Sequence, residues 1–186
     1  MDSFAQGLRL IQRMGGVERP AVLDLFESLG EAEFGEQCVG FIYGDVYHRP
    51  GLDLPDRQLA TIGALTALGY ASAQLQFHST AALNIGCSGR QVAEAIEVAA
   101  SIAGSETAYS GEAEGAGLTA KQREIVAIAA CTAIGTMIPR LQDHLRGLLD
   151  AGGTRKEAVE VLLHLAFYTG FPAALNAMAA AREVLA

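Results

Sequence analysis

The chain has 186 residues, of which 51% are hydrophobic, and a formal net charge of −8. This length and apolar content can build one compact domain, or two small domains that share an interface. The acidic balance and the lack of a Lys/Arg cluster argue against nucleic acid as a partner, because phosphate binding needs concentrated positive charge. No apolar run reaches the roughly 18 residues of a membrane-spanning helix. The N-terminus lacks a secretory signal pattern and the three cysteines are far apart, so we expect a cytoplasmic protein with reduced thiols.

The first fifty residues have the pattern of helices joined by turns. We expect helices at about 2–14, 20–30 and 33–46. Pro50 and Gly51 end the third helix, because proline cannot continue a helix and glycine favours a turn.

Three more helices are predicted before residue 104. The stretch "DLPDRQLATIGALTALG" is apolar at helical spacing, ends in a glycine stop and begins with Asp53, a suitable cap. The next helix carries His78 and is closed by Gly86. The third helix opens with Ser88 and Gln91 in the spacing of a capping box.

The same three-helix pattern then occurs a second time. With an offset of 66 residues, about fifty residues align without a gap, and the stretch 105–117 between the copies is polar and glycine-rich, as in a linker. Identical pairs include Leu52/Leu118, Arg57/Arg123, Gly69/Gly135, His78/His144, Gly86/Gly152 and Glu94/Glu160. We therefore predict an all-α fold with two tandem cores, divided into residues 1–104 and 118–186. The second part includes a C-terminal helix that begins near Pro172.

Three motifs in the sequence resemble those of the carboxymuconolactone decarboxylase family. They are "GDVYHRPGLDLPDRQLATIGALTALG", "QLQFHSTAALNIG" and "FYTGFPAALNAMAAAREVL". The resemblance implies the helical bundle of the alkyl hydroperoxidase D-like superfamily. The first two motifs stand in repeat one and the third stands only in repeat two. The chain thus looks like one decarboxylase unit with an extra helical core inserted before its tail, similar to the tandem hydroperoxidase relatives.

The hydroperoxidase relatives use a Cys-x-x-Cys pair followed by a histidine four residues later. The corresponding positions before His144 hold Met137 and Arg140, and repeat one lacks both cysteines as well. Dithiol chemistry needs a reactive thiolate and a resolving partner. A hydroperoxidase-like antioxidant protein is therefore the less favoured alternative.

The resemblance implies instead a cofactor-independent decarboxylase that acts on a lactone-like or polyketide-like carboxylate. In an unsaturated lactone, the electron pair left by CO2 can flow through the ring double bond to the lactone carbonyl. The substrate is then its own electron sink, so we expect neither a metal nor an organic cofactor. The protein has to bind a carboxylate, stabilise an oxyanion and protonate carbon.

His78 and His144 are the expected catalytic residues, because imidazole can donate a proton or stabilise an oxyanion near neutral pH. His78 lies in the second motif, one helical turn after Gln74. His144 lies one helical turn after Arg140. The expected substrate-binding residues are Arg49, Tyr43, Tyr47, Gln74 and Arg140. The competing interpretation is that the histidines are scaffold, and the duplication itself favours that interpretation.

Several other polar residues have a structural interpretation. Arg57 and Glu94 are expected to form an ion pair between the first and third helices of repeat one, and the duplicated Arg123 and Glu160 would do the same in repeat two. His164 and Tyr168, one helical turn apart, are expected in the core or in an interface.

A non-catalytic protein that binds a small molecule is the alternative function, and it would hold a carboxylate ligand without releasing CO2. We also expect a homo-oligomer, because a three-helix unit cannot bury all its apolar faces alone. Single-repeat decarboxylases of this family resemble one another in forming six-unit rings. A chain with two cores therefore predicts a trimer, with a dimer as the alternative.

Overall fold

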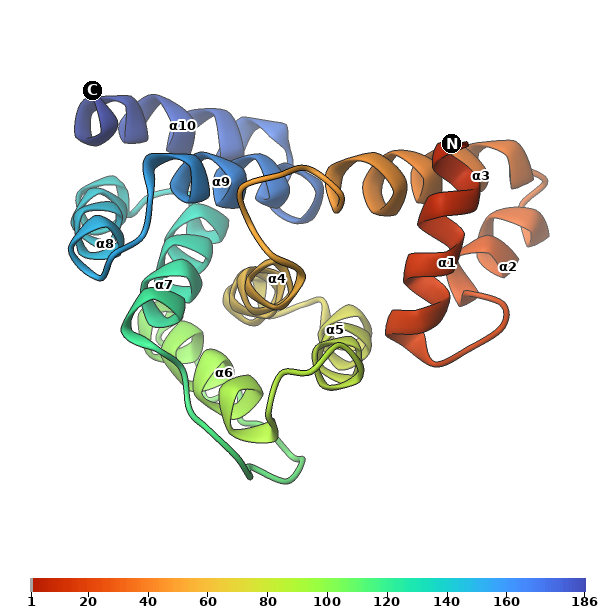
Figure 1. The fold of residues 1–186 in the computed structure, drawn as a ribbon, viewed down its shortest axis with the longest axis horizontal. Coiled ribbons are helices and arrows are strands. Elements are labelled where there is room, and N and C mark those ends of the chain that lie inside the picture. Colours follow the sequence, from red (N-terminus) through yellow and green to blue (C-terminus); the bar gives the residue numbers. More distant parts are fainter. Residues whose placement is uncertain (1) are drawn as a thin grey trace. The chain divides into compact units, whose positions relative to one another are not determined.

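The computed structural model describes residues 2–186, and every regular element in this range is a helix (Figure 1). The chain divides into two compact units, one up to Pro50 and the other Gly51–Ala186. The N-terminal unit contains α1 (Ser3–Gly15), α2 (Ala21–Ser28), α3 (Ala32–Val39) and the π-helix η1 (Gly40–Val46). The second unit contains α4 (Leu54–Leu68), α5 (Ser72–Asn84), α6 (Gly89–Ala103), α7 (Ala120–Ile134), α8 (Ile138–Asp150), α9 (Arg155–Thr169) and α10 (Phe171–Leu185).

Glycines let the backbones of the N-terminal unit approach closely. A Cβ atom on Gly7 of α1 would lie 2.4 Å from the carbonyl oxygen of Val39, and one on Gly44 would lie 2.0 Å from that of Ser3. Any side chain at these two positions would push α1 away from η1. The helix expected at 33–46 is two elements in the structure, α3 and the π-helical turn η1, and η1 packs against α1.

Helix caps set the boundaries of both repeats. The Asp53 side chain accepts a hydrogen bond from the backbone N–H of Asp56 and caps α4. The capping box expected from Ser88 and Gln91 forms at the start of α6, and equivalent boxes form at the starts of α7 and α9. Each box satisfies two backbone N–H groups that the first turn of a helix leaves without a partner.

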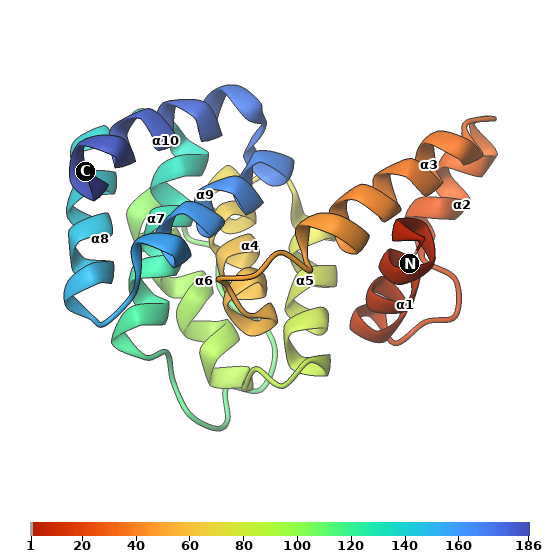
Figure 2. The same ribbon diagram turned by 45° about the horizontal axis from the view of Figure 1, so that its top comes forward.

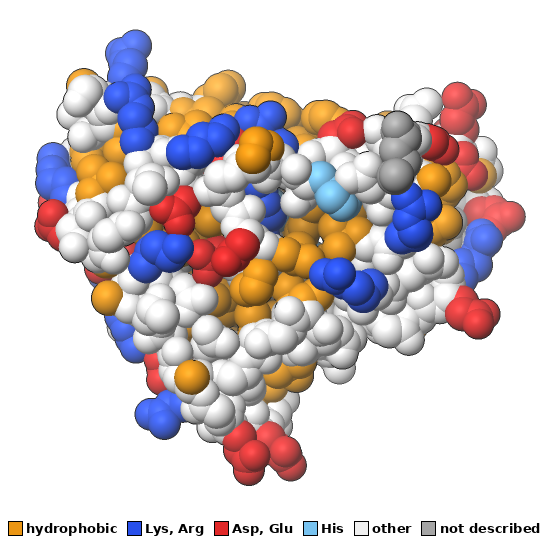
Figure 3. Space-filling view, viewed as in Figure 1, with side chains coloured by type: hydrophobic (Ala, Val, Ile, Leu, Met, Phe, Trp, Pro, Cys, Tyr) orange, Lys and Arg blue, Asp and Glu red, His pale blue; other side chains and the backbone are white. Residues whose placement is uncertain are grey.

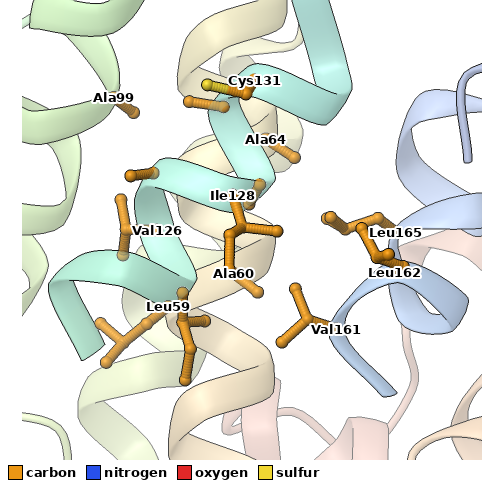
Figure 4. Packing of buried hydrophobic residues seen from close by; sticks show 14 of the residues in the cluster. Leu59, Ala60, Ala64, Ala99, Val126, Ile128, Cys131, Val161, Leu162 and Leu165 are labelled. Atoms are coloured by element: carbon orange, nitrogen blue, oxygen red, sulfur yellow. The ribbon is translucent and has the colours of Figure 1, made fainter. Parts of the chain in front are cut away.

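The two first helices of the repeats, α4 and α7, form the centre of the second unit (Figure 2). Both are buried nearly all round, from Asp56 to Thr66 in α4 and from Ile125 to Thr132 in α7. Figure 4 shows Leu59, Ala60 and Ala64 of α4 beside Val126 and Ile128 of α7, with Val161, Leu162 and Leu165 of α9 against them. Gly63 belongs to the same contact, since a Cβ there would lie 2.9 Å from the carbonyl oxygen of Val126.

The two repeats exchange their ion-pair partners. Arg57 Nη2 lies 3.3 Å from Glu160 Oε2, and Arg123 Nη2 lies 2.9 Å from Glu94 Oε2. The expected pairing within each repeat is therefore wrong, because each first helix packs against the third helix of the other repeat as well as its own. The contacts of one repeat recur in the other with the roles reversed, as in a two-fold symmetric dimer joined into one chain.

A pseudo-two-fold axis relates the two repeats, and residues at the same position of each repeat contact one another across it. Asp56 and Gln122 occupy the same position of the two repeats, and Gln122 Nε2 donates to Asp56 Oδ1 at 2.9 Å. Burial raises the pKa of the Asp56 carboxyl. Lys121 lies 3.5 Å from Asp56 and 2.7 Å from Glu157, so it separates two carboxylates that would otherwise repel.

The two exchanged ion pairs make a matched comparison of stability. Arg57 and Glu160 are fully buried, whereas Arg123 is 49% exposed. Arg57→Ala leaves the buried Glu160 carboxylate with Lys156 as its remaining partner and should cost about 3 kcal/mol of unfolding free energy, while Arg123→Ala should cost about 1 kcal/mol or less. Urea unfolding followed by circular dichroism measures both. Equal losses in the two variants would contradict the assignment of the buried pair as the main link between the repeats.

Candidate functional site

A buried polar cluster lies where α4, α5 and α9 meet. Its centre is His78 of α5, whose side chain is only 3% exposed and whose Nδ1 lies 2.9 Å from Gln58 Oε1 of α4. An amide oxygen can only accept, so Nδ1 carries the imidazole proton and Nε2 has the lone pair. Tyr168 of α9 packs against His78 edge to face, with ring centroids 5.2 Å apart.

A second histidine belongs to the same cluster. His164 Nε2 lies 2.8 Å from Thr61 Oγ1, and the Thr61 hydroxyl donates to the carbonyl oxygen of Arg57 at 3.0 Å. The Tyr168 ring also contacts the His164 ring, at 5.2 Å between centroids. One tyrosine thus lies against both imidazoles.

The exchanged ion pair adds charge to one side of this cluster. Arg57 on α4 and Glu160 on α9 come from the helices that also hold Thr61 and His164. Glu160 Oε1 accepts from Lys156 Nζ at 2.7 Å as well. Two cations therefore share one carboxylate, and the group has an excess of one positive charge.

Burial keeps both imidazoles neutral. It lowers the pKa of His78 to about 3. Burial also lowers the pKa of His164 well below its ordinary value, and the nearby Arg57 charge and His78 act in the same direction. Both causes penalise the protonated form. The cluster at neutral pH is therefore two neutral histidines beside an ion pair with a surplus of positive charge.

The three sequence motifs converge on His78. The first motif supplies Gln58 and Thr61, the second supplies His78 itself, and the third supplies Tyr168 from 90 residues further along the chain (168 − 78). The inserted core therefore does not separate the motifs in space, because the exchange between repeats brings α9 back to α4 and α5. The sequence predicts His164 and Tyr168 in the core or in an interface, and the structure places both in this cluster. Their spacing of one helical turn is the feature of the sequence that indicates they lie on the same face of α9.

His144 has the equivalent place in repeat two, but its surroundings differ. Its Nδ1 lies 2.8 Å from Glu124 Oε2, in the same geometry as His78 and Gln58, with a carboxylate in place of the amide. The two side chains are 26% and 27% exposed and line a hollow of about 360 Å³. The duplicated histidine is thus closed in repeat one and accessible in repeat two.

The remaining predicted site residues lie outside both histidine contacts. Gln74 and Arg140 are exposed, each one turn before a histidine on α5 or α8. Tyr43, Tyr47 and Arg49 belong to the N-terminal unit, where the two tyrosine rings stack at 5.1 Å and Arg49 is exposed. Their roles as substrate ligands stay predictions.

Within residues 2–186, no group of three or more His, Cys, Asp or Glu side chains is arranged to hold a metal ion. In the same range, no helix combines the length and the apolar character that crossing a bilayer requires. Cys87 and Cys131 are buried, and burial raises the pKa of both thiols, that of Cys87 to about 11.

The chain matches the sequence profile of the carboxymuconolactone decarboxylase family twice, over residues 32–113 and 106–183. It therefore belongs to this family and carries two tandem copies of its core. A similar curated protein is the 4-carboxymuconolactone decarboxylase of Acinetobacter baylyi, which is 40% identical over 68 residues. That stretch is 37% of this chain and 50% of the relative, so the chain spans half the length of the protein it matches. The family and the all-α tandem fold expected from the sequence are confirmed.

The buried histidines predict how stability depends on pH. Because the pKa of His78 is lower in the folded state than the 6.5 of a free histidine, the unfolded chain binds more protons below pH 6.5. Stability is thus fully present above pH 6.5 and falls between 6.5 and about 3, by up to about 1.4 kcal/mol per pH unit for this residue. Urea unfolding at pH 7, 6 and 5 measures the slope. His78→Gln should reduce the slope and leave the part due to His164, and an unchanged slope would mean that His78 titrates normally in the folded protein.

Proposed function

We propose that this protein is a cofactor-independent carboxy-lyase for a small lactone-like or polyketide-like carboxylate, with its chemistry at His78. The observation that carries the proposal is the convergence of all three family motifs on that one imidazole. Membership of the family and the name of the Acinetobacter relative support decarboxylation as the reaction.

The proposed reaction needs a cation, an electron sink and a proton. The surplus positive charge of Arg57 and Lys156 over Glu160 favours an anionic substrate next to the cluster. The C–CO2 bond breaks, and its electron pair moves through the ring double bond to the carbonyl oxygen of the substrate. The carbon that carries the resulting charge then takes one proton, so the net change is loss of CO2 and gain of H⁺.

His78 is suited to supply that proton only while substrate is bound. In the empty site it is neutral, because burial lowers its pKa to about 3 and Gln58 offers no charge to stabilise the imidazolium. A bound carboxylate raises the pKa, so His78 takes up a proton on Nε2 as substrate enters. When CO2 has left, that proton goes to carbon and His78 returns to its neutral form.

Aromatic side chains control access to His78. Phe77 and Tyr168 both lie edge to face against its ring, at 5.1 and 5.2 Å between centroids, and both are only partly buried. Substrate reaches the imidazole when these side chains turn aside.

Release of CO2 from a panel of lactone and polyketide carboxylates tests this function. His78→Gln keeps the hydrogen-bonding capacity but not the proton donor, so the rate should fall by about 10²- to 10⁴-fold. His144→Gln is the matched control at the equivalent position and should change the rate little. Thermal unfolding of both variants separates catalysis from folding.

Two outcomes would count against the proposal. Equal losses of activity and of stability in the two histidine variants would show that the duplicated histidine is scaffold. Saturable binding of a carboxylate without any release of CO2 would favour the alternative, a non-catalytic protein that binds a small carboxylate.

The proposal also includes a homotrimer, with a dimer as the alternative. Phe171 and Leu175 of α10 are 59% and 57% exposed, and Figure 3 shows hydrophobic side chains gathered along the edge where α10 lies. Burial of such a surface between chains is favourable. Light scattering should give a mass of three times the 19.5-kDa chain. Leu175→Glu should lower that mass, and a monomer at every concentration in the wild type would contradict the trimer.

A further inference from the structure

The hollow beside His144 exists because α6, the third helix of repeat one, has smaller side chains than α9 at three equivalent positions. Its lining residues are Glu97, Val98, Ser101, Ile102, Arg123, Glu124, Ala127 and His144. With the 66-residue offset, Val98, Ser101 and Ile102 correspond to His164, Phe167 and Tyr168 of α9, the helix whose Tyr168 ring lies against His78. The same histidine position is therefore filled on one side of the pseudo-symmetry axis and open on the other.

The histidine in the hollow is held by a carboxylate. Glu124 can only accept, so His144 donates its Nδ1 proton to Glu124. In repeat one the equivalent partner is the neutral Gln58. The exchange of an amide for a carboxylate adds one negative charge to the open hollow and none to the closed cluster.

Other lining groups leave the hollow with an excess of negative charge. Glu97 and Glu124 both line it, and Glu97 is exposed. The one lining cation, Arg123, shares Glu94 with Arg90, at 2.9 and 3.1 Å, so it offsets only one of the two lining carboxylates. Val98, Ile102 and Ala127 supply the apolar part of the lining. The net charge of this lining is opposite in sign to that of the group formed by Arg57, Lys156 and Glu160.

We propose that this hollow is a second binding site, for a small organic cation with an apolar body. The ammonium group of such a ligand lies between Glu97 and Glu124, and its apolar part lies on Val98, Ile102 and Ala127. A carboxylate is disfavoured there by the same two acids. The site is independent of the proposed decarboxylation at His78, and it shows that the two copies of the histidine contact have diverged towards ligands of opposite charge.

Benzylammonium is a suitable probe, with benzyl alcohol and benzoate as neutral and anionic comparators of nearly the same size. Binding is followed by titration calorimetry and by the NMR signals of the His144 ring, assigned through His144→Gln. Benzylammonium should shift these signals saturably, benzyl alcohol should bind more weakly, and benzoate should not shift them. The full-length wild-type chain is used throughout.

Two kinds of variant decide whether the hollow is the site. Glu97→Gln combined with Glu124→Gln should weaken benzylammonium binding by about tenfold, since each exposed charge pair contributes a few-fold at most. Glu106→Gln combined with Glu112→Gln removes two exposed linker charges instead and should leave binding unchanged. Ser101→Phe combined with Ile102→Tyr copies the filled repeat and should abolish binding.

The proposal is overturned by any of three results. One is benzoate binding at His144 as tightly as benzylammonium. Another is the same loss of affinity in the linker control as in the double variant of the hollow, which would indicate only a general effect of net charge. The third is the absence of saturable His144 shifts up to the solubility of the probe. Because none of these readouts measures CO2, a failure here is distinguishable from a failure of the decarboxylase assignment.

Discussion

The ion pair between Arg57 and Glu160 reaches from the first helix of repeat one to the third helix of repeat two, with both side chains fully buried. A charge without a partner is costly in such a place, so the two helices have to stay together. That constraint places α9 beside α4 and brings His164 and Tyr168 to His78. The polar cluster proposed as the site depends on this exchange, because neither repeat contains all of its members.

Duplication supplied two equivalent histidine contacts, and the neighbouring residues then made them different. Gln58 and Tyr168 surround a buried neutral imidazole in repeat one, whereas Glu124 and Ile102 leave a charged, open hollow in repeat two. The physical difference is a change of partner charge and of side-chain volume at equivalent positions. A histidine conserved by duplication therefore does not imply a duplicated site.

Local features of the sequence were enough for the helices, because a helix depends mainly on residues three or four positions apart. The Asp53 cap, the Ser88 capping box and the glycine stops set boundaries that the structure confirms. The candidate site was predicted only in part. His78 was expected, but Gln58 and Thr61 carry no distinctive local signal, and Gln74, although one turn from His78, is exposed.

The sequence by itself determined an all-helical chain with two tandem cores of the carboxymuconolactone decarboxylase family and a histidine at the same place in each. Only the tertiary structure decided that Arg57 pairs with Glu160 rather than Glu94, that the split motifs meet around His78, and that His144 lines a hollow. The reason is that a pairing within a repeat and a pairing between repeats leave the same pattern along the chain. The choice between them rests on how α4 and α7 pack together, which is a long-range contact that no local spacing records.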